Sequence, residues 1–223
     1  MTHTEAPRGR GRPRAGQETD LPRLLQGALD AFAEKGFGGT SVRDLARSLG
    51  VSHGLLTARF GSKEGLWFAA IEHALADSER AWREVGDSPD LDDLEALRQG
   101  IVRQVLASAA HPQMARIMNH EGAIDSPRVR FVVERFVNPL RPGVERLLAR
   151  LVDAGRIRPV PYATLHFLVV QGGGAQYASP AAAALLGAPA HPDEQAVRAH
   201  AETVADILIA GLAVTAPGSD GGP

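Results

Sequence analysis

The sequence predicts an all-α fold, and three observations support this prediction. From Leu21 onward, apolar residues recur at the spacing of one helix face, about 3.6 residues per turn. Glycine and proline interrupt this pattern at intervals that suit short helices joined by turns. No segment alternates apolar and polar residues with the period of two that a half-buried strand needs.

The first part of the chain is predicted to form three helices in succession. The first ends at Gly36, and its apolar face consists of Leu21, Leu25, Ala28 and Phe32. Two short helices follow at about 41–48 and 52–59, and Gly50 separates them. This arrangement predicts a small three-helix unit at the N-terminal end.

Further helices are predicted in the middle of the chain. A long helix begins near Ser62, and the apolar stripe beyond it ends near His111. Ser126 followed by Pro127 is typical of a helix start, because serine caps well and proline suits the first helical position. Prolines inside the following helical segment are expected to bend or split it, and Gly155 is placed to end it.

Two last helices are predicted at about 161–178 and 193–214. The second has a stripe of small and apolar residues, made of Val197, Ala201, Val204, Leu208 and Leu212. The apolar side of the first is made of Leu165, Leu168 and Val169. The run 172–174, three glycines, lies inside the first helix. Three interpretations stay open for it: a bend beside a cavity, close approach across a dimer, or a break between two short helices.

Charge is distributed unevenly along the chain. Residues 1–65 hold 10 Lys and Arg against 7 Asp and Glu, although the formal net charge of the whole chain is −2. A basic front on an acidic remainder favours a nucleic-acid surface at one end. The absence of cysteine excludes disulfides and cysteine-ligated zinc. Without an apolar run of about 18 residues or a secretory signal, a cytoplasmic protein that does not associate with membranes is expected.

The segment 40–56 has the pattern of a helix-turn-helix. Ser41 and Asp44 have the capping-box spacing for the first helix, and Ser52 can cap the second. Gly50 can supply the positive φ of the tight turn between them. In such a unit the second helix enters the major groove of DNA. An ordinary αα-hairpin explains the apolar positions equally well, so the segment alone leaves both interpretations open.

The stretch 24–75 resembles the DNA-binding domain of the TetR family of transcriptional regulators. The resemblance rests on the pieces AFAEKGF, TSVRDLA, LGVS and FGSKEGL, which keep the spacings of that family. It implies a three-helix DNA-binding domain at 19–66, followed by a helical effector-binding and dimerisation domain at 67–215. A basic arm, 1–18, and a tail, 216–223, are expected to be disordered.

Position by position, the resemblance implies a set of DNA-contacting residues. Arg43 matches a residue that commonly meets DNA, and Lys63 matches a lysine that binds phosphate at a helix N-terminus. His53, Gly54 and Leu55 match the groove-facing start of the recognition helix. The whole expected set comprises Arg10, Arg12, Thr40, Ser41, Arg43, Ser52, His53, Gly54, Leu55, Thr57 and Lys63.

Several of these positions have individual expectations. Thr40 and Ser41 are expected to bond phosphates through a hydroxyl or a backbone N–H. Thr57 stands where the family usually has an aromatic residue, and His53 stands where it often has lysine. Leu55 cannot hydrogen-bond a base, but it could contact a thymine methyl group.

The N-terminal arm contains RGRGRPR at 8–14, which resembles an AT-hook core. Arginines such as Arg10 and Arg12 in an extended segment suit a narrow A·T minor groove. A generic solvated basic tail is the alternative, and attraction to phosphates follows from either interpretation.

In the TetR family, the helices after the DNA-binding domain enclose a small-molecule pocket, and the last two pair with those of a second chain. The resemblance thus implies a homodimer through about 161–178 and 193–214; alternatively, these helices only cover the core of one chain. The expected pocket residues are Trp67, Met114, Met118, His120, Phe131, Phe136, His166, Phe167, Gln171 and Tyr177. The same residue types at helical spacing are also typical of a core. No cofactor and no metal are expected.

An enzyme is the competing class of protein. His111, His120 and Glu121 lie close together in the sequence and could suggest acid–base or metal chemistry. His120 and Glu121 are adjacent, however, so on a helix they point about 100° apart. Surface or capping residues are the preferred interpretation, and no catalytic motif is present.

The expected function is therefore a repressor that leaves a palindromic double-stranded operator when a small-molecule effector binds. A DNA-binding regulator without an effector, or an activator, stays open as an alternative. Release requires that the effector bind the two conformations with different affinity.

Overall fold

The computed structural model describes residues 20–86 and 91–214, with the backbone alone for 77–86. Within these ranges the chain is helical apart from turns and one isolated antiparallel bridge, between Ile157 and Ala213. The all-α prediction is therefore confirmed.

Some predictions fall outside the described residues. These are the basic arm, 1–18, with Arg10 and Arg12, and the tail, 216–223. In the part of the chain that is described, no helix has both the length and the hydrophobicity that crossing a bilayer requires.

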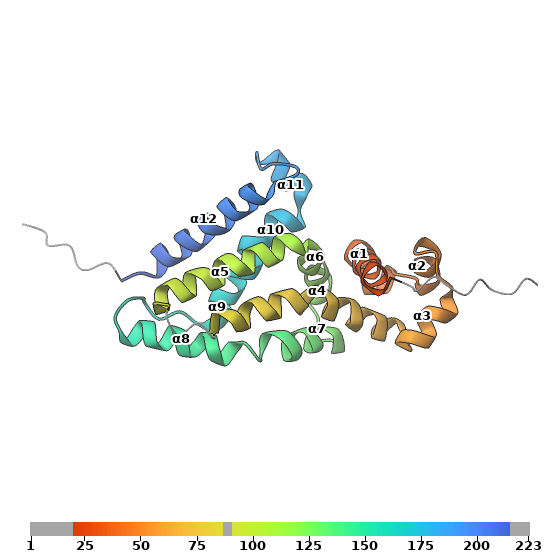
Figure 1. Ribbon diagram of the computed structural model, residues 1–223, viewed down its shortest axis with the longest axis horizontal. Coiled ribbons are helices and arrows are strands. Elements are labelled where there is room, and N and C mark those ends of the chain that lie inside the picture. Colours follow the sequence, from red (N-terminus) through yellow and green to blue (C-terminus); the bar gives the residue numbers. More distant parts are fainter. Residues whose placement is uncertain (1–19, 87–90, 215–223) are drawn as a thin grey trace, which may run out of the picture.

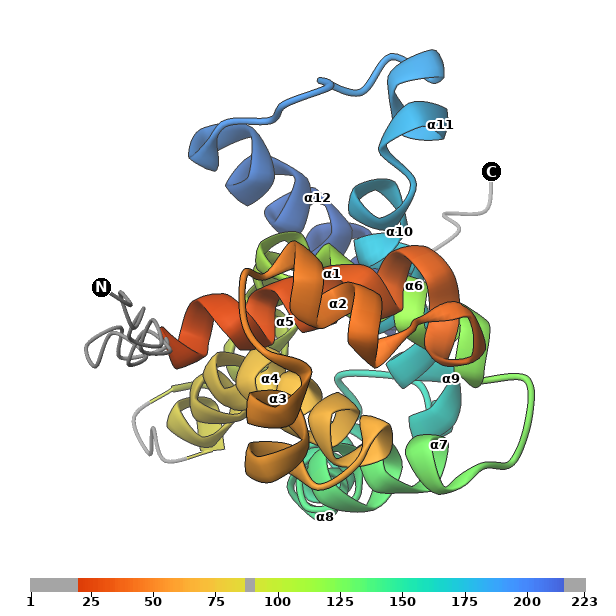
Figure 2. The ribbon, with the colours of Figure 1, turned by 90° about the vertical axis from the view of Figure 1, so that its right-hand side faces the viewer.

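The N-terminal helices are α1 (Leu21–Gly39), α2 (Val42–Ser48), α3 (His53–Phe60) and α4 (Lys63–Gly86). In Figure 1, α1, α2 and α3 form one end of the molecule, and α4 runs from α3 into the body. There α4 packs beside α5 (Asp93–Ala110). Figure 2 looks onto this end, with α2 and α3 toward the viewer.

The turn between α2 and α3 forms as the local sequence predicts. The hydroxyl oxygen of Ser41 accepts the N–H of Asp44 at 3.3 Å, and that of Ser52 accepts the N–H of Leu55 at 3.1 Å. Gly50 takes a positive φ of 68°. These caps satisfy N–H groups that a helix start would otherwise leave unbonded. They fix the residues at which α2 and α3 begin.

The body is built from α5, α6 (Pro112–Glu121), α7 (Pro127–Val132), α8 (Arg141–Asp153), α9 (Tyr162–Phe167), α10 (Gly173–Ala178), α11 (Pro180–Leu185) and α12 (Glu194–Leu212). Two π-helical turns, η1 (Val133–Val137) and η2 (Leu168–Gly172), continue α7 and α9. Ser126 caps α7 by accepting the N–H of Val129, and Gly155, with a φ of 65°, follows α8. Pro139 lies in the turn before α8 and Pro142 in its first turn, so the expected split occurs.

The body differs from the sequence prediction in two respects. The stretch 161–178, predicted as one helix, contains the π-helical turn η2 between α9 and α10. The apolar pattern does not single out α6 or α11 either, because both are short. A short helix shows too few turns for its period to be recognised.

A first hydrophobic core joins the N-terminal helices to the body. Phe32 of α1 and Trp67 and Ile71 of α4 are fully buried in it. The same cluster includes Ile117 of α6 and Phe136 of η1. The helix-turn-helix end is therefore not an independently packed domain, because its hydrophobic core continues into the body.

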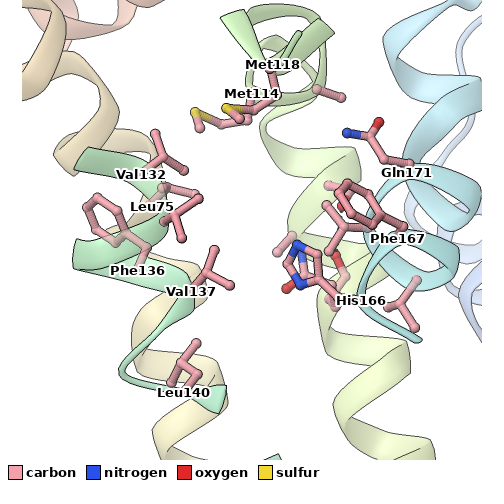
Figure 3. A pocket seen from close by; sticks show the side chains of 18 of the residues that line it. Leu75, Met114, Met118, Val132, Phe136, Val137, Leu140, His166, Phe167 and Gln171 are labelled. Carbon is pink, nitrogen blue, oxygen red and sulfur yellow. Dashed lines mark hydrogen bonds between the residues drawn. The ribbon is translucent and has the colours of Figure 1, made fainter. Parts of the chain in front are cut away.

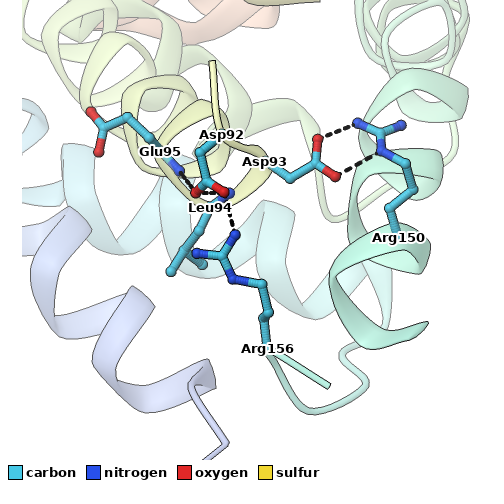
Figure 4. A network of polar contacts seen from close by, with 6 residues as sticks. All are labelled: Asp92, Asp93, Leu94, Glu95, Arg150 and Arg156. Carbon is cyan, nitrogen blue, oxygen red and sulfur yellow. Dashed lines mark hydrogen bonds and ion pairs between the residues drawn. The ribbon is translucent and has the colours of Figure 1, made fainter. Parts of the chain in front are cut away.

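A second core lies between α5, α8, α9, η2 and α12. Its most buried members include Ile101 and Val105 of α5, Leu151 of α8 and Ala201 of α12. Ion pairs reinforce the far end of α5 (Figure 4), where Asp93 takes a bidentate bond from Arg150 of α8 at 2.7 and 2.8 Å.

The N-cap residue of α5, Asp92, belongs to the same network (Figure 4). Its carboxylate accepts the N–H of Leu94 at 3.1 Å and pairs with Arg156, which follows α8. Hydrogen bonding from Arg156 lowers the pKa of Asp92, and bonding from Arg150 lowers the pKa of Asp93. The network holds α5 against α8 at the end of the body away from α3.

The predicted stripe on the last helix faces the chain's own core. Ala201 and Leu212 are buried in the second core, and Val204 and Leu208 pack against it. Leu165 and Val169 are buried there as well, whereas Leu168 is half exposed. The alternative that these stripes cover the core of one chain therefore holds for most of their residues.

The run 172–174 allows close packing inside the chain. A Cβ added at Gly173 would lie 2.6 Å from Cγ2 of Val105, and one at Gly174 would lie 2.9 Å from Cβ of Ser108. Gly172 is exposed, and a Cβ there would meet nothing within 4 Å. Two of the glycines thus let α10 approach α5, and the third lies on the outer face.

We expect Gly173→Ala to lower the free energy of unfolding by about 1–3 kcal/mol, because Val105 is stiff and fully buried. Gly143→Ala is the matched control, since it adds a methyl group to α8 in open space. The control is expected to be neutral or to stabilise by up to about 1 kcal/mol. Urea unfolding midpoints measure both changes, and equal midpoints for the two variants would contradict the proposed clash.

Candidate DNA-binding surface and ligand cavity

The N-terminal half of α3 presents an exposed surface. His53, Gly54 and Thr57 are exposed, and Leu55 is at the limit of exposure. Leu56, on the opposite side, is buried in the first core and fixes the rotation of the helix. The expected groove-facing residues therefore share one outward face.

On α2, two arginines differ in their partners. Arg47 donates to Asp44 at 2.9 Å, so its charge is locally compensated. Arg43 is exposed, and the described residues give it no ion pair. Of the two, Arg43 presents the less compensated positive charge beside the start of α3.

The structure corrects the expectation for Thr40. Its side chain is buried, and its hydroxyl donates to the carbonyl oxygen of Gly36 at 2.8 Å. Its N–H donates to the carbonyl oxygen of Phe37. Both groups are engaged within the chain, so Thr40 holds the end of α1 in place and offers no donor to phosphate. Ser41 is exposed; its oxygen caps α2, and its O–H can still donate outward.

Lys63 opens α4 and is held from one side. Its ammonium lies 4.5 Å from the ring centroid of Phe37 and 3.5 Å from the carbonyl oxygen of Gly38. A hollow of about 190 Å³ adjoins it, lined by Val42, His53, Leu56, Thr57, Gly61, Ser62, Lys63 and Leu66. The hollow is beside the short side chain of Thr57, where the resemblance leads one to expect an aromatic ring.

Arg128, at the start of α7, links the body to the N-terminal helices. It donates to Glu121 of α6 at 2.8 Å and to Glu64 of α4 at 3.3 Å. Its guanidinium carbon also lies 3.9 Å from the ring centroid of Phe37, the ring that Lys63 contacts. We call Phe37, Glu64, Glu121 and Arg128 the junction cluster. Through Phe37 it reaches a residue of the expected DNA-binding surface.

A cavity of about 720 Å³ lies in the body between α5, α6, α7, η1, α9 and η2 (Figure 3). Its lining comprises Leu75, Leu97, Ile101, Gln104, Ala107, Ser108, His111, Met114, Ala115, Met118, Asn119, Gly122, Ala123, Val129, Val132, Val133, Phe136, Val137, Leu140, Val144, Tyr162, Leu165, His166, Phe167, Val169, Val170 and Gln171. This volume falls in the range of pockets that hold drug-sized ligands.

Six of the ten predicted pocket residues line this cavity: Met114, Met118, Phe136, His166, Phe167 and Gln171. The other four, Trp67, His120, Phe131 and Tyr177, lie elsewhere, which corrects the prediction for them. Trp67 and Phe131 pack around Phe68 in the first core, where the Phe131 ring stacks at 4.3 Å. Tyr177 packs edge-on against His200.

His120 and Glu121 also separate in space. The His120 ring lies against Gly36 of α1, and Glu121 belongs to the junction cluster. His111, the third member of the sequence cluster, lines the cavity instead. Among the described residues, no group of three or more acidic residues and histidines is arranged to hold a metal ion.

Sequence reasoning missed several polar lining residues, namely Gln104, Ser108, His111, Asn119 and Tyr162. Those on α5 continue the face of Leu97 and Ile101 at helical spacing. That spacing is the signal that could have found them, because the apolar half of this face was recognised and its polar continuation was not.

Both π-helical turns lie in the cavity wall. Val133, Phe136 and Val137 of η1 line one side, and Val169 to Gln171 of η2 line the other. Such turns are rare and are frequently found at functional sites, because they change which side chains share a face.

Three aromatic side chains of α9 lie along the cavity wall. The His166 ring lies 5.7 Å from that of Tyr162 and 5.5 Å from that of Phe167. Burial lowers the pKa of His166 and raises the pKa of Tyr162. Both groups are therefore held in their neutral forms near pH 7, since these shifts move the charged forms away from neutrality.

The sequence family described as "Bacterial regulatory proteins, tetR family" matches residues 24–70. The HTH-type transcriptional regulator RutR of Escherichia coli strain K12 is 28% identical over 149 residues, covering 66% of this chain and 68% of RutR. The HTH-type transcriptional repressor Rv3405c of Mycobacterium tuberculosis strain H37Rv is 43% identical over 58 residues, 26% of this chain and 31% of that protein.

Among solved structures, the TetR family regulator PfmR from Thermus thermophilus superposes with a TM-score of 0.65. It is 24% identical, and the match covers 86% of this chain and 97% of PfmR. This likeness supports the fold of both the helix-turn-helix end and the helical body. The match over residues 24–70, together with the relatives named as HTH-type regulators, identifies a regulator of the TetR type.

Proposed function

We propose that this protein is a ligand-responsive transcriptional repressor. Two copies insert their α3 helices into successive major grooves of a palindromic operator, and a small molecule in the cavity releases them. The observation that carries the proposal is a shared hydrophobic core, which joins the exposed helix-turn-helix to the wall of a ligand-sized cavity. A bacterial protein that binds operator DNA works in the cytoplasm, where that DNA is.

DNA binding is supported by the exposed face of α3 and by the exposed Arg43 beside it. Lys63 adds a second cation at the start of α4, where helix N–H groups favour phosphate. The expected contacts divide into base readout from His53 and Leu55, and phosphate contacts from Ser41, Arg43 and Lys63. Phosphate contacts position the two α3 helices, and base contacts select the sequence.

Dimerisation is supported by an outer face on the last helices. Ile207 of α12 is 66% exposed and Leu168 of η2 is 50% exposed. Small exposed residues lie at helical spacing on the same stretches of chain: Gly172 and Ala175 follow Leu168, and Ala199, Thr203 and Ala210 lie around Ile207. In both views α12 lies at the rim of the molecule (Figures 1 and 2), so a second copy can pack there without displacing another element. Two α3 helices in one dimer fit the two-fold symmetry of a palindrome.

Coupling is supported by the junction cluster. Gly122, next to Glu121, and Val129, next to Arg128, both line the cavity. A ligand that moves either segment must therefore shift an ion pair that also contacts α4 and Phe37. Such a shift changes the angle of α4 and, with it, the separation of the two α3 helices. A ligand releases DNA only if it binds the shifted arrangement more tightly.

Loss of the Arg43 guanidinium is expected to weaken operator binding by about tenfold and to reduce the slope of log affinity against log salt by about 1. The double variant Arg43→Ala/Lys63→Ala is expected to lose about a hundredfold. Fluorescence anisotropy with the intergenic DNA upstream of the gene, or with genomic fragments selected by binding, measures both. Arg146→Ala, which removes an exposed arginine from α8, is the control. Operator affinity that stays the same in the double variant would contradict the assigned surface.

Ile207→Glu is expected to convert the dimer to monomers, because the introduced carboxylate would be buried at the interface without a partner. Ile124→Glu is a matched control, since Ile124 is 70% exposed but lies outside the proposed face. Sedimentation equilibrium measures the association, and operator titration measures its effect on DNA binding. If both variants dimerise as well as the parent protein does, the proposed face is not the interface.

The junction cluster is expected to couple energetically. In a double-mutant cycle of Arg128→Gln and Glu121→Gln, we expect an interaction of roughly 1–2 kcal/mol, because the two side chains are only 19% and 10% exposed. Arg130 and Asp125 form the control pair; both are well exposed, and no measurable coupling is expected.

The Arg128→Gln variant also tests the proposed switch. A compound that releases the parent protein from the operator is expected to bind this variant but to release it less. Full release in the variant would show that the signal takes another route.

A further inference from the structure

We propose that the cavity selects an uncharged, mainly apolar ligand that hydrogen-bonds along one side, through His166 and Gln171. This inference rests on the proposed function, because it takes the cavity as the effector site. It adds the chemical class of the effector and the residues that determine specificity.

One wall of the cavity is apolar throughout its described residues. Figure 3 shows Val132 of α7, Phe136 and Val137 of η1, and Leu140 of the turn that follows η1 on this side. Contact with this wall favours the removal of apolar surface from water, at about 25 cal/mol per Å². The body of the ligand is therefore hydrocarbon-like where it meets η1.

The opposite wall carries two of the cavity's polar side chains, His166 and Gln171. His166, Phe167 and Gln171 lie together on this side in Figure 3. In a regular α-helix, residues five apart point about 140° away from each other. In a π turn, closed by i→i+5 hydrogen bonds, they come back to nearly the same face. His166 at the end of α9 and Gln171 in the turn η2 both line the cavity.

His166 and Gln171 are neutral, and each can both donate and accept a hydrogen bond. An amide and a neutral imidazole each offer a donor and an acceptor, so they can bond a carbonyl or a hydroxyl group of the ligand. Burial keeps the pKa of His166 below its ordinary value, so the ring carries no charge near pH 7. The two groups therefore give the ligand hydrogen bonds without a charge to pair with.

Among the described residues that line the cavity, none is Asp, Glu, Lys or Arg. The nearby Arg141 stacks over the Tyr162 ring at 5.3 Å, and Glu145 pairs with it at 2.8 Å, so its charge is already compensated. An ionised ligand would lose its hydration in the cavity and would find no Asp, Glu, Lys or Arg among the described lining residues to pair with. Such burial costs several kcal/mol per ion.

Three probes with the same ten-carbon tail test the inference: 1-decanol, decanoate and decylammonium. The full-length protein is loaded with Nile red, a neutral fluorophore, and each probe displaces it near pH 7 without DNA present. We expect 1-decanol to bind at least about tenfold more tightly than either charged probe. Equal or tighter binding of a charged probe overturns the proposal. So does the absence of saturable Nile red binding or of its displacement by 1-decanol.

Variants locate the effect in this cavity. Gln171→Leu is expected to weaken 1-decanol by roughly threefold to tenfold, whereas Gln99→Leu, outside the lining, is expected to have no effect. Val137→Lys places an ammonium in the apolar wall and is expected to reverse the preference in favour of decanoate. An unchanged order of the three probes in Val137→Lys overturns the assignment to this cavity.

Operator titration is performed separately on the same preparations. Charge selection without operator binding would overturn the proposed function and leave the cavity's chemistry established. Operator binding without charge selection would overturn only the present inference.

Discussion

The packing of the N-terminal helices against α6, α7 and η1 is the constraint on which the rest of the structure depends. Trp67 and Ile71 of α4 are buried with Phe32 of α1 and Phe136 of η1 in one core. Protein interiors are packed about as densely as organic crystals, so no member of such a core can move far alone. Any displacement of η1 must be shared with α4, and α4 carries α3.

This shared core connects the cavity to the N-terminal helices. Phe136 belongs to the core and lines the cavity, so one side chain is in contact with both. The junction cluster adds a polar connection outside the core, through Arg128. The two connections differ in character, because the core resists separation whereas the ion pairs can rearrange between alternative partners. A switch needs both properties, namely a rigid lever and a contact with two states.

Local features of the fold could be predicted from the sequence because their causes are local. The caps at Ser41, Ser52 and Ser126 and the positive φ of Gly50 each depend on residues a few positions apart. The π turn η2 could not be predicted, since its sequence has no motif and its register depends on packing against α5. For the same reason the pattern predicts one helix where the structure has three elements.

In the candidate sites, too, features with local causes could be predicted and features that depend on packing could not. The exposed start of α3 follows from the helix-turn-helix pattern, but the fate of Thr40 depends on a carbonyl group across the kink of α1 at Gly36. Periodicity gives the apolar face of a helix and leaves open what covers it. Periodicity therefore does not distinguish a cavity from a core for Trp67 and Phe131. Their packing against Phe68 places them in the core.

The helices at the C-terminal end show why one sequence pattern can serve two interfaces. On α12, Ala201 and Leu208 face the second core, whereas Thr203 and Ile207 face outward. The glycine run divides in the same way, with Gly173 and Gly174 against α5 and Gly172 exposed. A helix with small residues on both sides can approach two partners closely, and the inner partner is already in place. In the proposed dimer the outer face receives the second copy, and because α9 and η2 also line the cavity, dimer packing and ligand contact would act on the same short segment.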